Sequence, residues 1–173
     1  QTQVVVHRDF HSRNLMRLSG SSVGVIDYQD AVIGPLTYDI VSLYRDCYIR
    51  LPKDWVIQKS LDYYRRAEKL GIASRASDKE IISWLDLMGL QRHIKVLGIF
   101  SRLHLRDSKH SYLNDLPLVI RYIIEQLRPH PRLSNFLEWF ECKILPVVSS
   151  QSWYKPWEEA GDFQLKSNEG FKS

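Results

Sequence analysis

The feature that most constrains this chain is a polar loop, close to its start, that lies between short apolar segments. Residues 3–6 form a mostly apolar run of strand length that leads directly into the loop. After the loop, residues 15–18 and 23–26 are two more runs of this kind, separated by the turn-forming sequence Ser-Gly-Ser-Ser at 19–22. Short apolar runs bounded by turn residues predict a strand, then a loop, then a β-hairpin.

The loop and the residue that follows the hairpin carry the side chains that phosphoryl transfer requires. Residues 7–14 have the sequence His-Arg-Asp-Phe-His-Ser-Arg-Asn, which fits the template H-R-D-x-x-x-x-N without a gap. Asp9 can orient a substrate hydroxyl or accept its proton. Asn14 and Asp27 offer oxygen ligands to the Mg²⁺ that carries the phosphates of ATP. The alternative is a charged surface turn in which Asp9 and Asn14 are turn or cap residues, and the strand, loop and hairpin pattern argues against it.

These residues resemble the aminoglycoside phosphotransferase and choline kinase superfamily. The second His of the loop, His11, and residues 27–39 carry the resemblance. Protein kinases usually have Gly after Asp-Phe at the second site, whereas this chain has Asp-Tyr-Gln at 27–29 and no activation-segment ending of the Ala-Pro-Glu kind. The chain is similar in particular to bacterial sugar kinases that phosphorylate N-acetylmuramate and N-acetylglucosamine at the anomeric hydroxyl. The segments that carry this similarity are 5–16, 27–35, 91–100 and, more weakly, 112–117, within a region of about 4–128.

The resemblance implies roles for five further residues around the loop. Asp39 is similar to the Asp that hydrogen-bonds the backbone of the catalytic loop in this superfamily, and a helix N-cap role is compatible with that. His7 and Arg8 brace the same loop. Met16 and Ile26 resemble the residues that form the floor of the nucleotide pocket. The cofactors that the resemblance implies are ATP and Mg²⁺.

Beyond the hairpin, the chain is predicted to be helical. Apolar residues recur at helical spacing, and Ser-Asp-Lys-Glu at 77–80 is a capping box. The expected helices cover residues 39–50, 54–70, 77–105, 115–128 and 134–145. The expected fold class is therefore mainly α with a small β-hairpin, the C-terminal lobe of the protein-kinase-like fold, over residues 1–145. A polar tail follows at 146–173, whose aromatic residues are candidates to dock it: Trp153, Tyr154 and Trp157.

The N-terminal, ATP-binding lobe of such a kinase has no counterpart in this sequence. There is no Gly-rich phosphate loop and no strand with a Lys of the V-A-I-K kind. The chain also begins with Gln1 directly at a strand-like segment. We therefore expect a C-terminal lobe of a longer protein, inactive by itself, whose partners are a small-molecule substrate and its own missing N-terminal lobe.

Composition narrows the class of protein further. The 173 residues are 44% hydrophobic, enough for one compact domain. The net charge is +4, but Lys and Arg alternate with acids, so no nucleic-acid surface is indicated. No apolar run has membrane-spanning length. Cys47 and Cys142 have no metal-binding or C-x-x-C spacing, as is typical of free thiols in a reducing compartment. We expect a cytoplasmic protein that binds neither nucleic acid nor membrane.

The acceptor substrate is where the sequence leaves alternatives open. Sites for polycationic aminoglycosides need clusters of acids, whereas acids here are interleaved with Lys and Arg. A neutral N-acetyl sugar, or one with a lactyl carboxylate, fits this balance better, and Arg45 and Arg92 are candidates to pair with that carboxylate. Asp30 is a candidate ligand of a sugar hydroxyl or a turn cap. Residues 91–93 either bind the sugar or have a structural role, as a polar helix face or as a satisfied, semi-buried His. The alternatives are an aminoglycoside, choline or homoserine kinase, or a non-catalytic kinase-lobe fragment.

Overall fold

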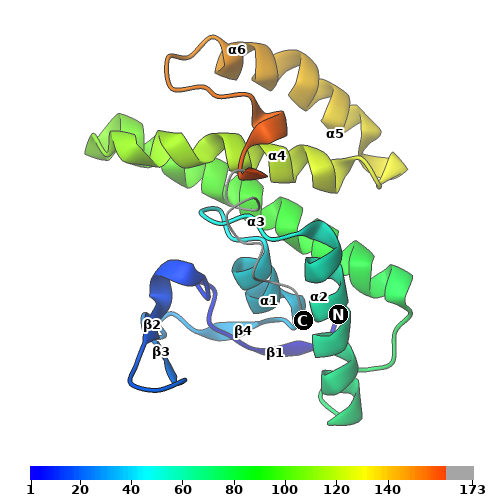
Figure 1. Ribbon diagram of the computed structural model, residues 1–173. Coiled ribbons are helices and arrows are strands. Elements are labelled where there is room, and N and C mark those ends of the chain that lie inside the picture. Colours follow the sequence, from blue (N-terminus) through cyan, green and yellow to red (C-terminus); the bar gives the residue numbers. More distant parts are fainter. Residues whose placement is uncertain (163–173) are drawn as a thin grey trace. The chain divides into compact units, whose positions relative to one another are not determined.

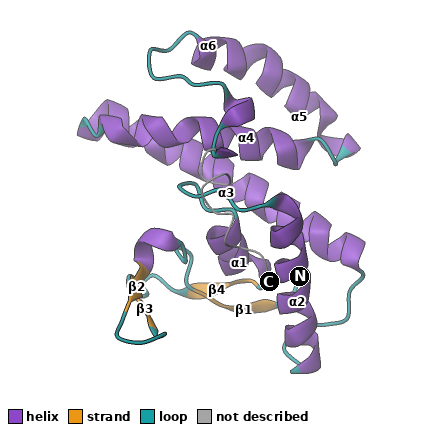
Figure 2. Cartoon of the chain, in the orientation of Figure 1, coloured by secondary structure: helices purple, strands orange, loops and turns teal. Residues whose placement is uncertain are grey.

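The structure, a computed structural model, describes residues 1–162 and is mainly helical, with two small antiparallel sheets (Figures 1 and 2). The chain forms two compact units, Gln1–Met88 and Gly89–Ser173. The long helix α3 (Asp78–Asp107) contributes its first part to unit 1 and the rest to unit 2. The expectation of a mainly α chain with a small hairpin is thus confirmed, with one sheet more than the sequence predicted.

The predicted strand and hairpin are present at the start of unit 1. Strand β1 (Gln3–Val6) precedes the polar loop, and β2 (Leu15–Arg17) pairs antiparallel with β3 (Val23–Val25). The turn between β2 and β3 contains Gly20 at a φ of 73°, a left-handed conformation that glycine adopts without steric cost.

Strand β4 (Val32–Pro35), which no sequence pattern predicted, pairs antiparallel with β1. The register places Val5 opposite Ile33 and Val4 opposite Gly34. A Cβ on Gly34 would lie 2.7 Å from Cγ2 of Val6, so the two strands approach too closely there for a side chain. Only two apolar residues precede Gly34 in β4, which is too short a pattern to predict a strand from sequence.

Helix α1 (Thr37–Tyr44) is shorter than predicted. The sequence pattern extended it to residue 50, but the backbone leaves the helix at Arg45, which has φ −119° and ψ 49°. The carboxylate of Asp46 then accepts a hydrogen bond from the backbone N–H of Tyr48, 3.1 Å away. A short acidic side chain that bonds nearby backbone offers the chain an alternative to helix, and that explains the early end.

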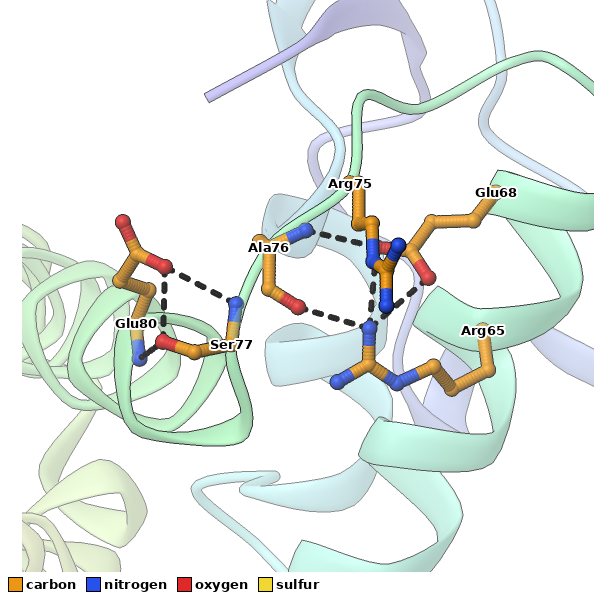
Figure 3. Close-up of a pocket in the computed structure, with 6 residues that line it drawn as sticks. All are labelled: Arg65, Glu68, Arg75, Ala76, Ser77 and Glu80. Carbon is orange, nitrogen blue, oxygen red and sulfur yellow. Dashed lines mark hydrogen bonds and ion pairs between the residues drawn. The ribbon is translucent and has the colours of Figure 1, made fainter.

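Two helices complete unit 1, and the sequence predicted both. They are α2 (Lys53–Lys69) and the first part of α3. The capping box is confirmed, because the backbone N–H and hydroxyl of Ser77 both donate to Glu80 and the backbone N–H of Glu80 donates back to the Ser77 hydroxyl (Figure 3). A cluster of buried side chains from α1, α2, α3 and the segments that join them forms the core, namely Leu36, Ile40, Val41, Tyr64, Ala67, Ala76, Ile81 and Leu85.

A polar hollow lies beside the start of α3, and its side chains are largely paired with one another (Figure 3). Arg65 on α2 donates to the carboxylates of Glu68 and Asp78 and to the carbonyl of Ala76. Glu68 in turn accepts the backbone N–H of Ala76 at 2.8 Å. These bonds tie the end of α2 to the turn before α3.

Unit 2 is helical in the part that the structure describes. After α3 come the 3₁₀ turn η2 (His110–Asp115), α4 (Leu116–Leu127), the 3₁₀ turn η3 (Pro131–Leu133), α5 (Ser134–Trp139), the π-helical turn η4 (Phe140–Ile144), α6 (Leu145–Ser149) and the 3₁₀ turn η5 (Trp157–Glu159). The helix predicted at 134–145 therefore continues to Ser149, with a π turn in its middle.

The segment before residue 162 contacts α4 through two arginines. Arg121 donates to the carbonyl of Ala160 and to the carboxylate of Asp162, at 2.9 and 2.7 Å. The guanidinium of Arg128 lies over the ring of Trp157, 5.6 Å from its centroid. The remainder of the tail predicted at 146–173, from residue 163 on, lies outside the described residues. Across residues 1–162, the structure contains no helix that is both long and apolar enough to cross a membrane.

Candidate active site

The candidate site is the polar loop that leaves β1, and its first residues are bonded to α1. Val6, the last residue of β1, is buried, so the loop starts from a fixed point. The backbone N–H groups of His7 and Arg8 donate to the two carboxylate oxygens of Asp39, at 2.6 and 3.0 Å. Arg8 has a φ of 75°, an uncommon left-handed conformation for a side-chain-bearing residue. The structure therefore brings together the three residues expected to support the loop.

The side chain of His7 connects the loop to the residue before Asp27. Its Nε2–H donates to the carbonyl of Ile26 at 2.9 Å, and its ring makes an edge contact with Phe10 at 5.8 Å between centroids. The hydroxyl of Ser42 donates to the carbonyl of Tyr38 at 3.1 Å and also lies within 3.5 Å of the carbonyl of Arg8. The chain segments on both sides of the hairpin are therefore held together.

The candidate metal ligands Asn14 and Asp27 lie side by side. The hairpin places them there, because the backbone N–H of Ile26 donates to the carbonyl of Asn14 at 3.1 Å. The Asn14 amide donates from Nδ2 to the carbonyl of Asp9 at 2.9 Å and to Oδ2 of Asp27 at 3.4 Å. Gln29 donates to the other oxygen of Asp27 at 2.6 Å. Asp27 itself has a φ of 65°, a second left-handed residue in this small site.

The donor set at this point is compatible with Mg²⁺. The Asn14 amide is held through its nitrogen, and no residue within 1–162 donates a hydrogen bond to its Oδ1 atom. Each carboxylate oxygen of Asp27 accepts one bond and keeps a further lone pair. Two protein oxygen ligands suit Mg²⁺, which usually takes one or two side chains and completes its shell with water and substrate phosphates. Groups of three or more His, Cys, Asp or Glu in metal-binding geometry do not occur within the described part of the chain.

The other end of the loop is bonded to the residues that follow α1, a contact that no sequence pattern predicted. The carboxylate of Asp46 accepts the backbone N–H of Ser12 at 3.0 Å and its hydroxyl at 2.5 Å. Gln29 and Ser42 were missed as well. Gln29 could have been found, because it is a polar residue only two positions after Asp27. Asp46 lies 34 positions from Ser12, so no sequence spacing indicates that the two residues meet.

The residues expected to form the floor of a nucleotide pocket are exposed apolar side chains. Met16 on β2 is 50% exposed, and Ile26, just after β3, is 47% exposed. Asp30 is also exposed, and its backbone carbonyl accepts a bond from Arg8 at 3.4 Å. Burial raises the pKa of the Tyr63 phenol on α2, and the negative charge of the Asp39 carboxylate raises that pKa further.

The residues expected to contact the substrate carboxylate are both buried. Arg45 in unit 1 donates to the carbonyl of Leu85 at 3.1 Å and to Asp86 at 2.7 Å, so its guanidinium joins the end of α1 to α3. Arg92 lies in the unit 2 part of α3 and is 4% exposed. These placements favour a structural role for Arg45, and contact of either arginine with a substrate stays a prediction.

The neighbouring His93 is a core residue. It is fully buried, its ring stacks on Tyr122 with 4.7 Å between centroids, and its Nδ1–H donates to Oε1 of Gln126 at 3.2 Å. Of the two hypotheses for residues 91–93, the structure favours a buried, hydrogen-bonded histidine over a sugar ligand at this position.

The comparisons with known proteins agree with the chemistry of this site. Residues 1–71 match the model of the phosphotransferase enzyme family (APH), so the resemblance seen in the sequence is confirmed for that part of the chain. Similar proteins include the N-acetylmuramate/N-acetylglucosamine kinases of Pseudomonas putida (44% identical), Pseudomonas aeruginosa (42%) and Neisseria meningitidis (40%). The alignments cover 78–80% of this chain and 40% of each relative, so the chain spans about two fifths of the length of the curated relatives it matches.

Proposed function

We propose that this chain is the C-terminal lobe of an ATP-dependent phosphotransferase with a kinase-like fold, and that the acceptor is a hydroxyl of an amino sugar such as N-acetylmuramate or N-acetylglucosamine. The proposal rests on one observation: at the β2–β3 hairpin, the Asn14 side chain donates hydrogen bonds both to the carbonyl of Asp9 and to the carboxylate of Asp27. The homology to three kinases of these two sugars supports the choice of acceptor.

Each residue of the site has a distinct part in the proposed reaction. Asp9 orients the acceptor hydroxyl and accepts its proton. Asn14 and Asp27 hold Mg²⁺, which neutralises charge on the phosphates when it is bound. Asp39 accepts hydrogen bonds from the backbone N–H groups of His7 and Arg8, and in this way it fixes the direction in which the Asp9 side chain points from the loop. The site thus contributes mainly positioning and electrostatics, which is what phosphoryl transfer requires.

The exposed apolar residues of the hairpin are the proposed contact for the nucleotide base. Met16 and Ile26 each present about half of their surface to solvent. Covering such apolar side chains with an adenine ring and with an N-terminal lobe would stabilise both contacts, at about 25 cal/mol for each Å² removed from water. The N-terminal lobe is part of this proposal as the source of the phosphate-covering loop and of the phosphate-binding Lys.

The charge balance of the chain supports a neutral or anionic acceptor. Arg65 is paired with Glu68 and Asp78, and Arg106 with Asp107, so these acids do not form the free cluster that a polycationic aminoglycoside would need. Asp30 is exposed, three residues after Asp27, and is the proposed contact for a sugar hydroxyl. Arg45 and Arg92 are each a candidate partner of a lactyl carboxylate, and Arg45 would have to exchange its bond to Asp86 for one to the substrate.

A substrate panel tests the proposal. The full-length product of the gene that contains this chain is incubated with ATP, Mg²⁺ and one acceptor at a time: N-acetylmuramate, N-acetylglucosamine, a kanamycin-type aminoglycoside, choline or homoserine. We expect phosphate transfer to one or both sugars, and little turnover when residues 1–173 are used alone. Transfer to an aminoglycoside or choline and to neither sugar would refute the acceptor, and no transfer to any acceptor would favour a non-catalytic protein.

A further inference from the structure

We propose that Asp46 is a positioning residue of the catalytic loop: by holding Ser12, it sets where Asn14 lies relative to Asp9 and so tunes the metal-binding geometry. The inference rests on the proposed function, because it assigns Asn14 to a metal site. It adds a second anchor to the loop, beside the one that Asp39 provides.

The environment of Asp46 shows that its carboxylate is committed to the loop. The residue is 2% exposed, and burying a carboxylate is costly unless hydrogen bonds compensate it. Oδ2 accepts both the backbone N–H and the hydroxyl of Ser12, and Oδ1 accepts the backbone N–H of Tyr48. Bonds to an ionised acceptor are shorter and stronger than neutral ones. Two of the three bonds that compensate this buried group therefore come from one loop residue.

The residues on either side of Ser12 pack against the segment that Asp46 holds. The guanidinium of Arg13 lies 3.4 Å from the ring centroid of Tyr48, and the ring of His11 makes an edge contact with the same ring at 5.7 Å. Because Asp46 also accepts the N–H of Tyr48, one carboxylate orders both the loop residue and the aromatic ring on which its neighbours rest.

The position of Asn14 depends on this ordered turn. Residues 12–14 form the 3₁₀ turn η1 (Ser12–Asn14), and the backbone N–H of Asn14 donates to the carbonyl of His11 at 2.9 Å. The Asn14 side chain then bonds the carbonyl of Asp9. If Ser12 is released, the turn that connects Asp9 to Asn14 loses its hydrogen bonds to Asp46, and the Asn14 side chain is less firmly held beside Asp27.

Three variants separate positioning from plain stabilisation. Asp46→Ala removes the anchor, Ser12→Ala removes one of the two loop bonds, and Asp46→Asn retains one acceptor oxygen for Ser12 but sets an amide N–H₂ against the N–H of Tyr48. The matched control is Glu68→Ala, which removes another carboxylate of unit 1 that accepts a backbone N–H from a different element, far from the loop in sequence.

Three measurements are made on the full-length protein: thermal unfolding, Mn²⁺ affinity in the presence of a non-hydrolysable ATP analogue, and steady-state kinetics. For Asp46→Ala we expect Mn²⁺ affinity and kcat to fall by about 10- to 100-fold, as is usual when a group that orients a metal ligand is lost. The KM for the sugar should stay near that of the unmodified protein. Ser12→Ala and Asp46→Asn should give intermediate losses, and Glu68→Ala should lower the Tm without changing Mn²⁺ affinity.

Amide hydrogen exchange gives a readout that does not depend on turnover. In folded Asp46→Asn and Ser12→Ala, the amides of residues 10–14 should exchange faster than in the unmodified protein, while those of α2 should not. If Asp46 variants lower the Tm but leave Mn²⁺ affinity, kcat and exchange of the loop unchanged, Asp46 is only a stabilising residue and the inference is wrong. If the unmodified protein phosphorylates no sugar yet the Mn²⁺ and exchange results hold, the proposed acceptor fails and the positioning role stands.

Discussion

Replacing glycine by alanine should change the stability of the protein in opposite directions at two positions of helix α3. Both Gly89 and Gly98 lie in the unit 2 part of α3, where replacing a glycine by alanine gains about 1 kcal/mol of helix stability if nothing else changes. An ideal Cβ on Gly98 has no described atom within 4 Å outside its own helical neighbourhood. An ideal Cβ on Gly89 lies 2.5 Å from Nε2, 3.0 Å from Cδ and 3.2 Å from Oε1 of Gln126. The whole amide group of Gln126 therefore stands in the way.

The amide of Gln126 cannot yield without a further loss. The residue is 3% exposed, on the buried side of α4, and its Oε1 accepts the hydrogen bond of the fully buried His93. Overpacking a core costs about 1–3 kcal/mol, and losing a net hydrogen bond costs about 1 kcal/mol. Against the gain of about 1 kcal/mol in helix propensity, Gly89→Ala should destabilise the protein by about 1–3 kcal/mol. For a chain of this size, that lowers the Tm by roughly 3–10 °C.

Urea unfolding and thermal unfolding of the two variants measure the effect. Gly98→Ala should raise the free energy of unfolding by up to about 1 kcal/mol, whereas Gly89→Ala should lower it. Adding Gln126→Ala to Gly89→Ala should cost less than Gln126→Ala alone, since the amide is already displaced. If Gly89→Ala stabilised the protein as much as Gly98→Ala, the close packing of α3 on Gln126 would be refuted.

Three further predictions concern the site and the start of α3. In the full-length protein, Asp9→Asn should remove most of the activity while sparing nucleotide binding, and Asp27→Ala should weaken Mg²⁺-dependent nucleotide binding; near-normal turnover of both would contradict the assigned roles. Asp39→Ala removes the acceptor of two half-buried backbone N–H groups in the loop, so it should destabilise the protein by about 1 kcal/mol for each lost hydrogen bond, measured by urea unfolding. Bonds from Ser77 lower the pKa of the Glu80 carboxyl, so its stabilising effect is fully present above the usual glutamate pKa and is lost as the pH falls through the lowered value. Glu80→Gln should therefore be less stable than the unmodified protein at neutral pH, and the difference should shrink in unfolding curves taken at increasingly acid pH.

Local patterns in the sequence were enough to predict most of the elements and to single out the candidate reactive groups. The hairpin, the capping box at Ser77 and the starts and ends of α2, α3 and α4 followed from turn residues, caps and apolar spacing, which act within a few residues of one another. The spacing of Asp9, Asn14 and Asp27 around one strand and one hairpin was also local, so the chemistry could be inferred before any contact was known.

Contacts between groups that are distant in the sequence became known from the structure alone. Strand β4 forms because it pairs with β1, and α1 ends early because Asp46 turns to bond Tyr48 and Ser12. The salt bridge of Arg45 with Asp86 joins residues 41 positions apart and occupies a side chain that the sequence had suggested for substrate. Such pairings leave no periodic signal in the sequence, because each is selected by the packing of whole elements. For the same reason, the hydrogen bonds from Ser12 to Asp46 could be found only in the structure.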